Sequence, residues 1–319
     1  MDHLELRKKL EQWEPELVKT LPPLPTGLVE EYITIPSSSS PKKLKIIRPS
    51  HPPATAPLIL LFHGGGFRAG TIEQLTRPGR EFAEAFGAVV VSASYLFIPE
   101  HPFPAPVEDA YDTLLWVARN AGEAFGVDVR REKGGRGRFV VGGVSAGASL
   151  AAVLAALAIE RGDLSKEGVE ITGSFLAIPR LVEKEILPSE YASLWTSREE
   201  YPNGGGEGFS AALTVKFLEL TRSLLKPDVH SPLYSPINAP EEVLKQLPRT
   251  YIQVGGQDCL RDDGVVYERF LKDRGVEVRL DSHPNLGHGA YNVFAQKGDE
   301  DEQRLRDTTM EGMKWLLGL

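Results

Sequence analysis

The sequence is poor in cysteine and in positive charge, and both shortages narrow the class of protein. Cys259 is the single cysteine among 319 residues, so the chain can form no internal disulfide and no thiolate metal cluster. Lysine and arginine number 36 against 44 acidic residues, a net charge of −8, and no long basic run occurs. This balance argues against a nucleic-acid surface or an anionic-membrane partner. The 7 histidines lack metal-ligand spacing, so no metal and no cofactor are expected.

Long hydrophobic runs are also missing. The longest apolar stretch, from about 148 to 159, falls short of the roughly 20 residues that span a bilayer. The first 19 residues are dense in charge and lack the apolar core of a signal peptide. Hydrophobic residues make up 41% and charged residues 25% of the chain, which is ordinary for a globular protein. We therefore expect a soluble, cytoplasmic protein.

Short apolar segments alternate with helical ones from residue 57 onwards, which predicts an α/β fold with a mostly parallel sheet covered on both faces. Strands are expected at 58–62, at 88–95, in the run that begins at 139, and at about 173–178, 250–255 and 277–283. Helices are expected at roughly 72–86, 107–124, 263–274 and 301–317. Another helix is expected directly after the strand run that begins at 139, ending at about 161. Two extended segments, about 30–36 and 43–48, predict a hairpin before the first of these strands.

Residues 183–230 break this rhythm, since they hold two helix-like pieces and no strand. They are expected to form a lid with the N-terminal helix, although an ordinary crossover with a long loop is the alternative. Leu4, Leu10, Trp13 and Leu17 share one face of that helix and should pack over Ser145 against the apolar stripe in 209–225. The alternative is a helix that packs on the back of the sheet.

The predicted division of the chain follows from this interpretation. It has an N-terminal cap segment with the leading strand, a catalytic domain in two pieces, and a cap insertion: 1–45, 46–182 with 231–319, and 183–230.

The motif Gly143-Val144-Ser145-Ala146-Gly147 joins an apolar strand to a helix. That is the position of a nucleophile elbow, in which a sharp turn exposes the serine and flanking glycines allow close approach. The alternative is a glycine-rich turn with a capping serine.

His63 is followed by three glycines directly after the 58–62 strand. Consecutive glycines bury nothing, but they suit a loop whose backbone amides point at an oxyanion, together with the amide of Ala146. A phosphate-cradling loop is the alternative, although no Lys-Ser/Thr follows it. His63 itself is expected to brace the loop.

A serine nucleophile needs a base and an orienting carboxylate, here in the chain order Ser, Asp or Glu, His. Asp258 lies directly after a strand, whereas Asp262 and Asp263 resemble the first residues of the next helix. For the base, His288 lies in a glycine-flanked turn, and His283 ends the last strand. We expect Asp258 and His288 to serve Ser145. His3, His51, His101 and His230 are expected to be surface or turn residues.

Five ordered motifs resemble the hormone-sensitive-lipase group of α/β-hydrolase carboxylesterases, from about residue 57 to the C-terminus. They are HGGGF at 63–67, YLFIPEHPFPAPVEDAYDTLLWV at 95–117, GVSAG at 143–147, SPLYSPINA at 231–239 and QVGGQDCLRDDG at 253–264. The resemblance implies an α/β-hydrolase fold with a helical cap. It also implies Ser145 as nucleophile, Asp258 as acid, His288 as base, and Gly64, Gly65 and Ala146 as oxyanion donors.

The sequence departs from the family pattern at a few positions. Val144 stands where the family usually has aspartate, Ala148 where it has glycine, and Cys259 where many members have proline. Cys259 is expected to be a small buried residue. The stretch 175–185 also differs from the family pattern, and this difference concerns the substrate pocket and its specificity.

The expected function is a serine carboxylic-ester hydrolase that forms an acyl-enzyme and acts on short- to medium-chain or metabolite esters. The alternative is a non-hydrolytic protein of the same fold, either a ligand receptor or a cyclase or acyltransferase. The expected partner is a small-molecule ester, and a homodimer is one assembly that the protein could form.

Overall fold

The fold is built on one eight-stranded sheet. The structure is a computed structural model that describes residues 3–37, 40–130, 137–205, 213–291 and 300–319. The strands are β1 (Leu28–Ile35), β2 (Lys42–Pro49), β3 (Leu58–Phe62), β4 (Val89–Ala93), β5 (Phe139–Val144), β6 (Gly173–Ala177), β7 (Arg249–Gly255) and β8 (Val278–His283).

The strand order is β1-β2-β4-β3-β5-β6-β7-β8. β1 pairs antiparallel with β2, and β2 with β4, while the six strands from β3 to β8 run parallel. The predicted hairpin and the mostly parallel sheet are therefore confirmed. Since the strands from β3 to β8 point the same way, the loops after β3, β5, β7 and β8 meet at one edge of the sheet.

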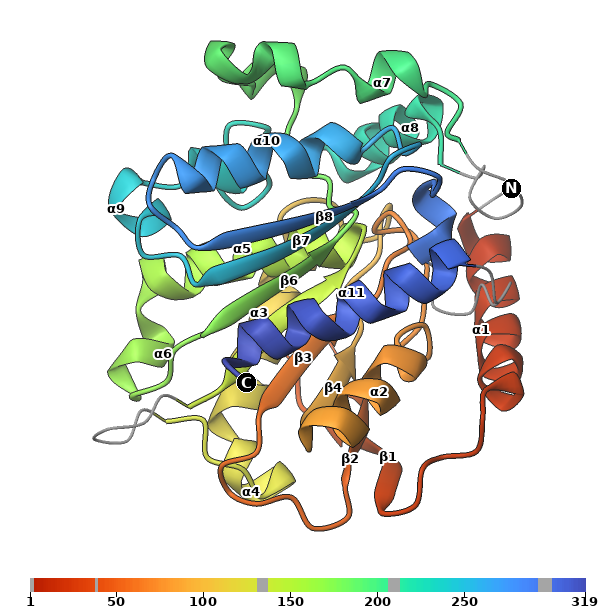
Figure 1. Cartoon of the computed structure of the whole chain (residues 1–319), viewed down its shortest axis with the longest axis vertical. Helices are drawn as coiled ribbons and strands as arrows, with labels where there is room; N and C mark the ends of the chain where they lie inside the picture. The colour runs from red at the N-terminus through yellow and green to blue at the C-terminus, as the bar shows by residue number, and fades with distance from the viewer. Residues whose placement is uncertain (1–2, 38–39, 131–136, 206–212, 292–299) are drawn as a thin grey trace.

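Helices cover both faces of the sheet (Figure 1). α3, α5 and α10 lie on one face, and α2 and α11 lie on the other. The helices are α1 (His3–Thr20), α2 (Thr76–Phe86), α3 (Ala105–Arg119), α4 (Ala121–Phe125), α5 (Ala146–Arg161), α6 (Asp163–Lys166), α7 (Ser197–Glu200), α8 (Val215–Leu225), α9 (Glu241–Leu244), α10 (Arg261–Lys272) and α11 (Glu300–Leu317).

Side-chain alternation along the strands divides the core into two layers. On β3, Leu58, Leu60 and Phe62 contribute to the layer beneath α3 and α5, and Ile59 and Leu61 to the layer beneath α2 and α11. All five are buried, because a parallel strand covered on both faces has no solvent side. The first 13 residues of α5 are buried too, which explains its run of small alanines.

Three predicted boundaries differ from the structure. The segment 107–124 is expected as one helix but forms α3 and α4, because the chain breaks at Asn120, whose backbone and side-chain N–H groups both donate to the Trp116 carbonyl. The helix expected from 72 begins at Thr76. The boundary predicted after residue 45 falls inside β2.

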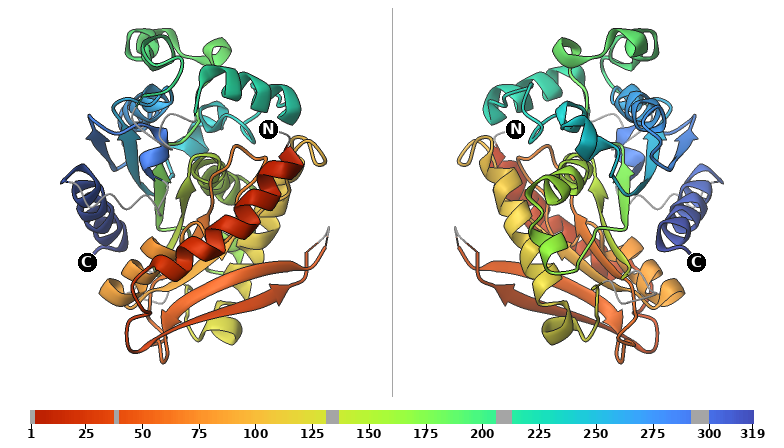
Figure 2. Two further views of the ribbon diagram at one scale, coloured as in Figure 1. Left: turned by 90° about the vertical axis from the view of Figure 1, so that its right-hand side faces the viewer. Right: turned by 90° about the vertical axis from the view of Figure 1, so that its left-hand side faces the viewer.

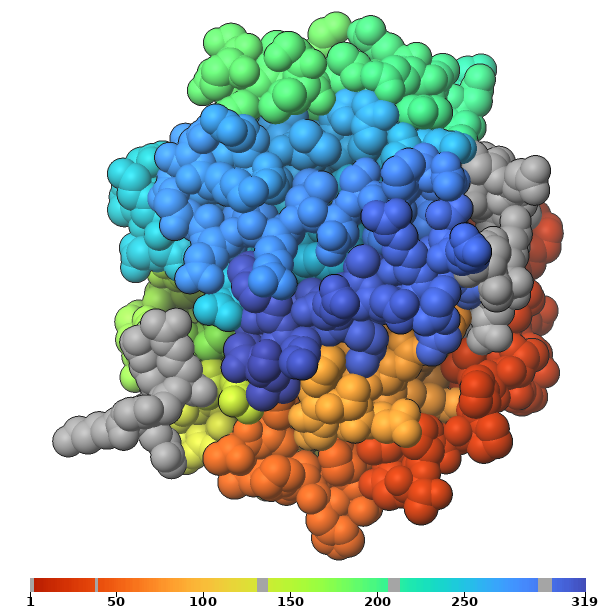
Figure 3. Space-filling model, viewed as in Figure 1, coloured from red at the N-terminus to blue at the C-terminus, as the bar shows by residue number. Residues whose placement is uncertain are grey.

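The segment 183–230 carries short 3₁₀ turns, α7 and α8, and its described part contains no strand. In the view of Figure 1, α7 lies above α10 at one end of the molecule and α8 lies beside the right-hand end of α10. The space-filling view shows this segment along that end (Figure 3). α1 runs along a flank, from the β1–β2 hairpin towards α8 (Figure 2). In the part of the chain that the structure describes, no helix is both long enough and apolar enough to cross a membrane.

Candidate active site

The turn between β5 and α5 holds Ser145 in a strained backbone conformation, with φ 54° and ψ −117°. Its N–H donates to the Ala177 carbonyl at 2.8 Å, which ties the turn to β6. A Cβ on Gly147 would lie 2.0 Å from the Phe62 carbonyl oxygen, so only glycine allows the turn to come this close to β3. The strain and the close approach together match the expected nucleophile elbow.

His288 lies between Ser145 and Asp258. Its Nε2 is 2.9 Å from Ser145 Oγ, and its Nδ1 is 2.7 Å from Asp258 Oδ2. A carboxylate can only accept, so Nδ1 carries the proton and Nε2 is free to accept from the serine hydroxyl. The structure thus brings together the three residues that the sequence singled out, in the arrangement of a nucleophile, a base and an orienting acid.

Backbone contacts between two loops place His288 beside Asp258. The Gly256 N–H donates to the His283 carbonyl at 2.8 Å, and the Gln257 N–H donates to the Leu286 carbonyl at 3.0 Å. Asp258 is 1% exposed, and its second carboxylate oxygen accepts from the Leu260 N–H at 2.9 Å. The loop after β7 therefore fixes the carboxylate, and the turn after β8 carries the imidazole to it.

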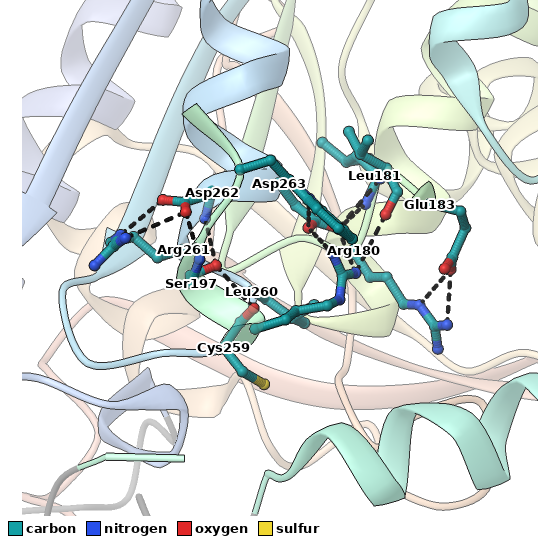
Figure 4. A network of polar contacts seen from close by, with 12 residues as sticks. Arg180, Leu181, Glu183, Ser197, Cys259, Leu260, Arg261, Asp262 and Asp263 are labelled. Atoms are coloured by element: carbon teal, nitrogen blue, oxygen red, sulfur yellow. Dashed lines mark hydrogen bonds and ion pairs between the residues drawn. The ribbon is translucent and has the colours of Figure 1, made fainter. Parts of the chain in front are cut away.

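The rejected candidates have other neighbours. His283 is buried at the end of β8, 3.3 Å from the Thr308 hydroxyl of α11, and burial lowers its pKa. Asp262 and Asp263 both lie in the first turn of α10 and hold the cap insertion and the residues that lead into it (Figure 4). Asp262 accepts from the Ser197 N–H at 2.6 Å, and Asp263 accepts from the Leu181 N–H at 3.0 Å.

The glycine loop after β3 uses its first amide internally. The Gly64 N–H donates to Gln74 Oε1 at 2.6 Å, so this group is directed at a side chain of the protein. This contact contradicts the expectation that Gly64 donates to an oxyanion. The error is one of register, since the sequence could not show which of three successive amides the fold already uses.

The next two amides are oriented by contacts to the carbonyls before them. In a trans peptide the C=O and the following N–H point in opposite directions. His63 Nδ1 holds the Gly64 carbonyl at 2.7 Å, and the N–H groups of Arg68 and Ala69 hold the Gly65 carbonyl. Within the described residues, the Gly65 and Gly66 amides have no hydrogen-bond partner. Ala146 begins α5, and the first N–H groups of a helix have no partner inside it.

His63 braces this loop, as expected. It is 1% exposed, and burial lowers its pKa to about 4, so the ring is neutral at pH 7. Because the Gly64 carbonyl can only accept, the Nδ1–H group of His63 donates to it. Nε2 then carries no proton and accepts from the Ser94 hydroxyl at 2.9 Å. Its ring stacks on Tyr95, with 4.7 Å between the centroids.

Helix α8 covers the glycine loop from the cap side. A Cβ on Gly66 would lie 2.8 Å from the Phe217 ring, and the Arg68 guanidinium lies 5.4 Å from the centroid of that ring. Leu213, Leu218 and Phe217 pack on Cys259 and Leu260. The described part of the 209–225 stripe therefore lies against the loops around Ser145, while Phe209 falls outside the described residues.

Helix α1 reaches the same loop by polar contacts. Arg7 donates to the carbonyls of Arg68 and Ile98, both at 2.7 Å, and pairs with Glu100. Leu4, expected on the packed face, is 49% exposed, and α1 and α8 share no extended interface among the described residues. The prediction that their apolar stripes pack together is therefore wrong, because each helix packs beside the glycine loop and, in the described part of the chain, the two share no extended interface.

Cys259 is buried, as expected, and burial raises the pKa of its thiol to about 12, so it stays protonated. Val144 is buried on the face opposite α5, among Leu61, Phe175 and Ala177. The valine therefore fills the core behind the elbow, where an aspartate would lack solvent.

The sequence reasoning missed two residues, Gln74, which accepts from the Gly64 N–H, and Glu14, which accepts from the Thr71 hydroxyl. Glu14 lies four residues after Leu10 and three before Leu17, within the apolar face of α1. A carboxylate in an apolar stripe was the available signal. Gln74 gave none.

Comparison with known proteins agrees with this geometry. Residues 59–292 match the model of a family described as having the α/β-hydrolase fold. The chain is 34% identical to esterase LipI of Mycobacterium tuberculosis over 238 residues, which cover 74% of this chain and 66% of LipI. The aligned region thus spans just under two thirds of that relative.

Solved structures resemble the whole chain. The crystal structure of vibralactone cyclase superimposes with a TM-score of 0.85 and 29% identity, covering 100% of this chain and 90% of the cyclase. An esterase of Pyrobaculum calidifontis gives a TM-score of 0.78 and 30% identity, covering 99% and 93% of the two chains.

Proposed function

The chain belongs to the hormone-sensitive-lipase-like carboxylesterases of the α/β-hydrolase fold, and from this premise we propose that it is a serine carboxylic-ester hydrolase whose nucleophile is Ser145. The observation that carries the proposal is the hydrogen-bonded line from Ser145 Oγ through His288 to Asp258. His288 takes the serine proton as the oxygen attacks the ester carbonyl, and Asp258 stabilises the imidazolium.

The oxyanion that forms in this step is held by backbone amides. Ala146 and Gly65 are donors, as the sequence predicts, and Gly66 takes the place of Gly64, whose N–H is engaged by Gln74. His288 then protonates the leaving alcohol, and water repeats the sequence on the acyl-enzyme. Each donor of this kind contributes about 10²–10³ in rate.

Short- to medium-chain or metabolite esters are the proposed substrates. A narrow, mostly apolar hollow lies beside Ser149, one turn along α5 from Ser145. Phe67, Leu150 and Leu225 are among the residues that line it. The apolar side chains along this hollow offer a surface against which a short acyl or alkyl group could pack. We also propose a cytoplasmic location, which the single buried cysteine supports, and a homodimer as the assembly.

Lactone formation is a second candidate, favoured by the likeness to vibralactone cyclase. The same acyl-enzyme would then be attacked by a hydroxyl of the bound acyl group in place of water. A ligand receptor is disfavoured, because His288 Nε2 lies 2.9 Å from Ser145 Oγ, as a general base would.

The test is a panel of p-nitrophenyl esters from acetyl to dodecanoyl, with a fluorophosphonate probe mapped by mass spectrometry. Wild type should hydrolyse the short esters and carry the phosphonate on Ser145, while Ser145→Ala should fold and lose both activities. An adduct on another residue would rule out the assignment. A hydroxy-acyl thioester that yields lactone faster than free acid would favour the second candidate.

A further inference from the structure

A buried carboxyl group on α1 lies close to the glycine loop. Glu14 is 2% exposed and is the one residue of α1 that is fully buried. The Thr71 hydroxyl donates to its Oε2, and in the described part of the chain no cation pairs with it. Burial raises the pKa of Glu14 to about 7. A glutamine or a methionine would be buried here at lower cost, so stability does not explain the carboxyl.

Gln74 links this carboxyl to the glycine loop. The Gln74 N–H donates to the Thr71 carbonyl at 3.2 Å, and the Thr71 hydroxyl donates to the Glu14 carboxyl. At its other end, Gln74 Oε1 accepts from the Gly64 N–H at 2.6 Å. The link therefore runs from α1 to a backbone amide.

Gly64 is next to the nucleophile. A Cβ on Gly64 would lie 3.4 Å from Ser145 Cβ and 3.2 Å from the Val144 carbonyl oxygen. The Gln74 contact fixes the peptide plane that enters the loop, and the His63 contact fixes the plane that follows. These two planes determine where the Gly65 amide points, since each peptide is rigid.

We propose that Glu14 and Gln74 are positioning residues, which dock α1 onto the glycine loop and thereby hold the oxyanion donors in register with Ser145. The proposal rests on the proposed ester hydrolysis, because it assigns the loop to the oxyanion. In this role the N-terminal helix acts through the glycine loop and need not touch the substrate. Loss of the Glu14 and Gln74 contacts should therefore lower the rate of acylation and not only change ester specificity.

The experiment compares four variants. Gln74→Met keeps the side-chain length and removes the hydrogen bond from the Gly64 N–H, and Glu14→Ala removes the carboxyl. Glu14→Gln keeps an oxygen that can accept from the Thr71 hydroxyl. Glu11→Gln is the matched control, since Glu11 is an exposed carboxylate on the same helix.

Turnover of p-nitrophenyl acetate is the first readout. Gln74→Met should lower kcat by about 10–100-fold with KM within about twofold, because a misplaced donor is lost mainly in the transition state. Glu14→Ala should lower kcat by about 5–20-fold, and Glu14→Gln should restore it to within about threefold. The control should match wild type. Unchanged kcat in both Gln74→Met and Glu14→Ala would overturn the proposal, and so would a loss that Glu14→Gln does not rescue.

Deuterium exchange of residues 63–70 is the second readout and does not depend on ester turnover. Exchange should rise in Gln74→Met and Glu14→Ala and stay at the wild-type level in Glu14→Gln and Glu11→Gln. If wild type hydrolyses no ester, the proposed function fails while this arm still decides whether Glu14 holds the loop. Wild-type exchange in all four variants would overturn the proposal by itself.

Discussion

Asp258, Asp262 and Asp263 lie within six positions of one another, yet the fold gives them unlike tasks. Asp258 faces the imidazole of His288 at 2.7 Å. Asp262 faces the backbone of the cap insertion at Ser197, and Asp263 faces the backbone at Leu181, just before that insertion. What separates them is the start of α10 at Arg261, which turns the two later side chains away from the edge of the sheet.

Asp258→Asn should therefore lower kcat by about 10³–10⁴-fold, because an amide at this position no longer holds the proton on Nδ1 of His288. Asp262→Asn should stay within about tenfold of wild type, since its partners do not touch the triad. Steady-state rates on p-nitrophenyl acetate would check both. Equal losses in the two variants would contradict the assignment of Asp258.

At the scale of elements, the first turn of α10 fastens the cap segment to the sheet. Asp263 is fully buried and accepts from the N–H groups of Leu181 and Val182, and it pairs with Arg198 at 2.8 Å. One carboxylate thus joins the segment after β6 to the helix α7 that follows it. The cap is held by polar contacts at its base and by the apolar contacts of α8.

Asp263→Asn should loosen the cap without altering the triad. An amide can accept only through one oxygen, and Arg198 would lose its buried counter-charge, which costs about 3–5 kcal/mol when one partner of a buried pair is removed. We expect a lower Tm and a raised KM for longer esters, with the phosphonate still reacting at Ser145. A Tm equal to that of wild type would show that the cap does not depend on this contact.

The sheet and the contacts among Ser145, His288 and Asp258 could be predicted from the sequence because their signals are local. Val144-Ser145-Ala146 carries its turn in its own residues, and the strands carry theirs as apolar runs. The cap could not be predicted in the same way. Arg7, Glu14 and Gln74 act through partners far away in the chain, and neither spacing nor composition identifies those partners.

At the scale of the whole molecule, Glu14 makes stability depend on pH. Its ordinary pKa of 4.5 is raised to about 7 in the fold, so the folded state holds a proton that the unfolded state releases between those values. Stability therefore falls as pH rises through this window and is level above it. Glu73 and Tyr95 face Glu14 from neighbouring segments, and the charge of Glu73 is offset by Lys45.

Glu14→Gln, which does not titrate, should gain stability over wild type between pH 5 and pH 8, by about 3 kcal/mol at most. Urea unfolding of both proteins at each pH would measure the difference, and other titrating groups cancel in the comparison. A difference that stays constant across this range would mean that Glu14 is already ionised at pH 5.

The order of the triad along the chain also sets when activity can begin during synthesis. Ser145 follows β5, Asp258 follows β7, and His288 follows β8, the last strand among the described residues. Domains fold from the N-terminal side as they emerge from the ribosome. A nascent chain can therefore place Ser145 on a paired sheet before His288 has been synthesised. An unfinished chain that lacks β8 and His288 would therefore carry an inert serine. Ester hydrolysis would begin only when the final parallel strand docks.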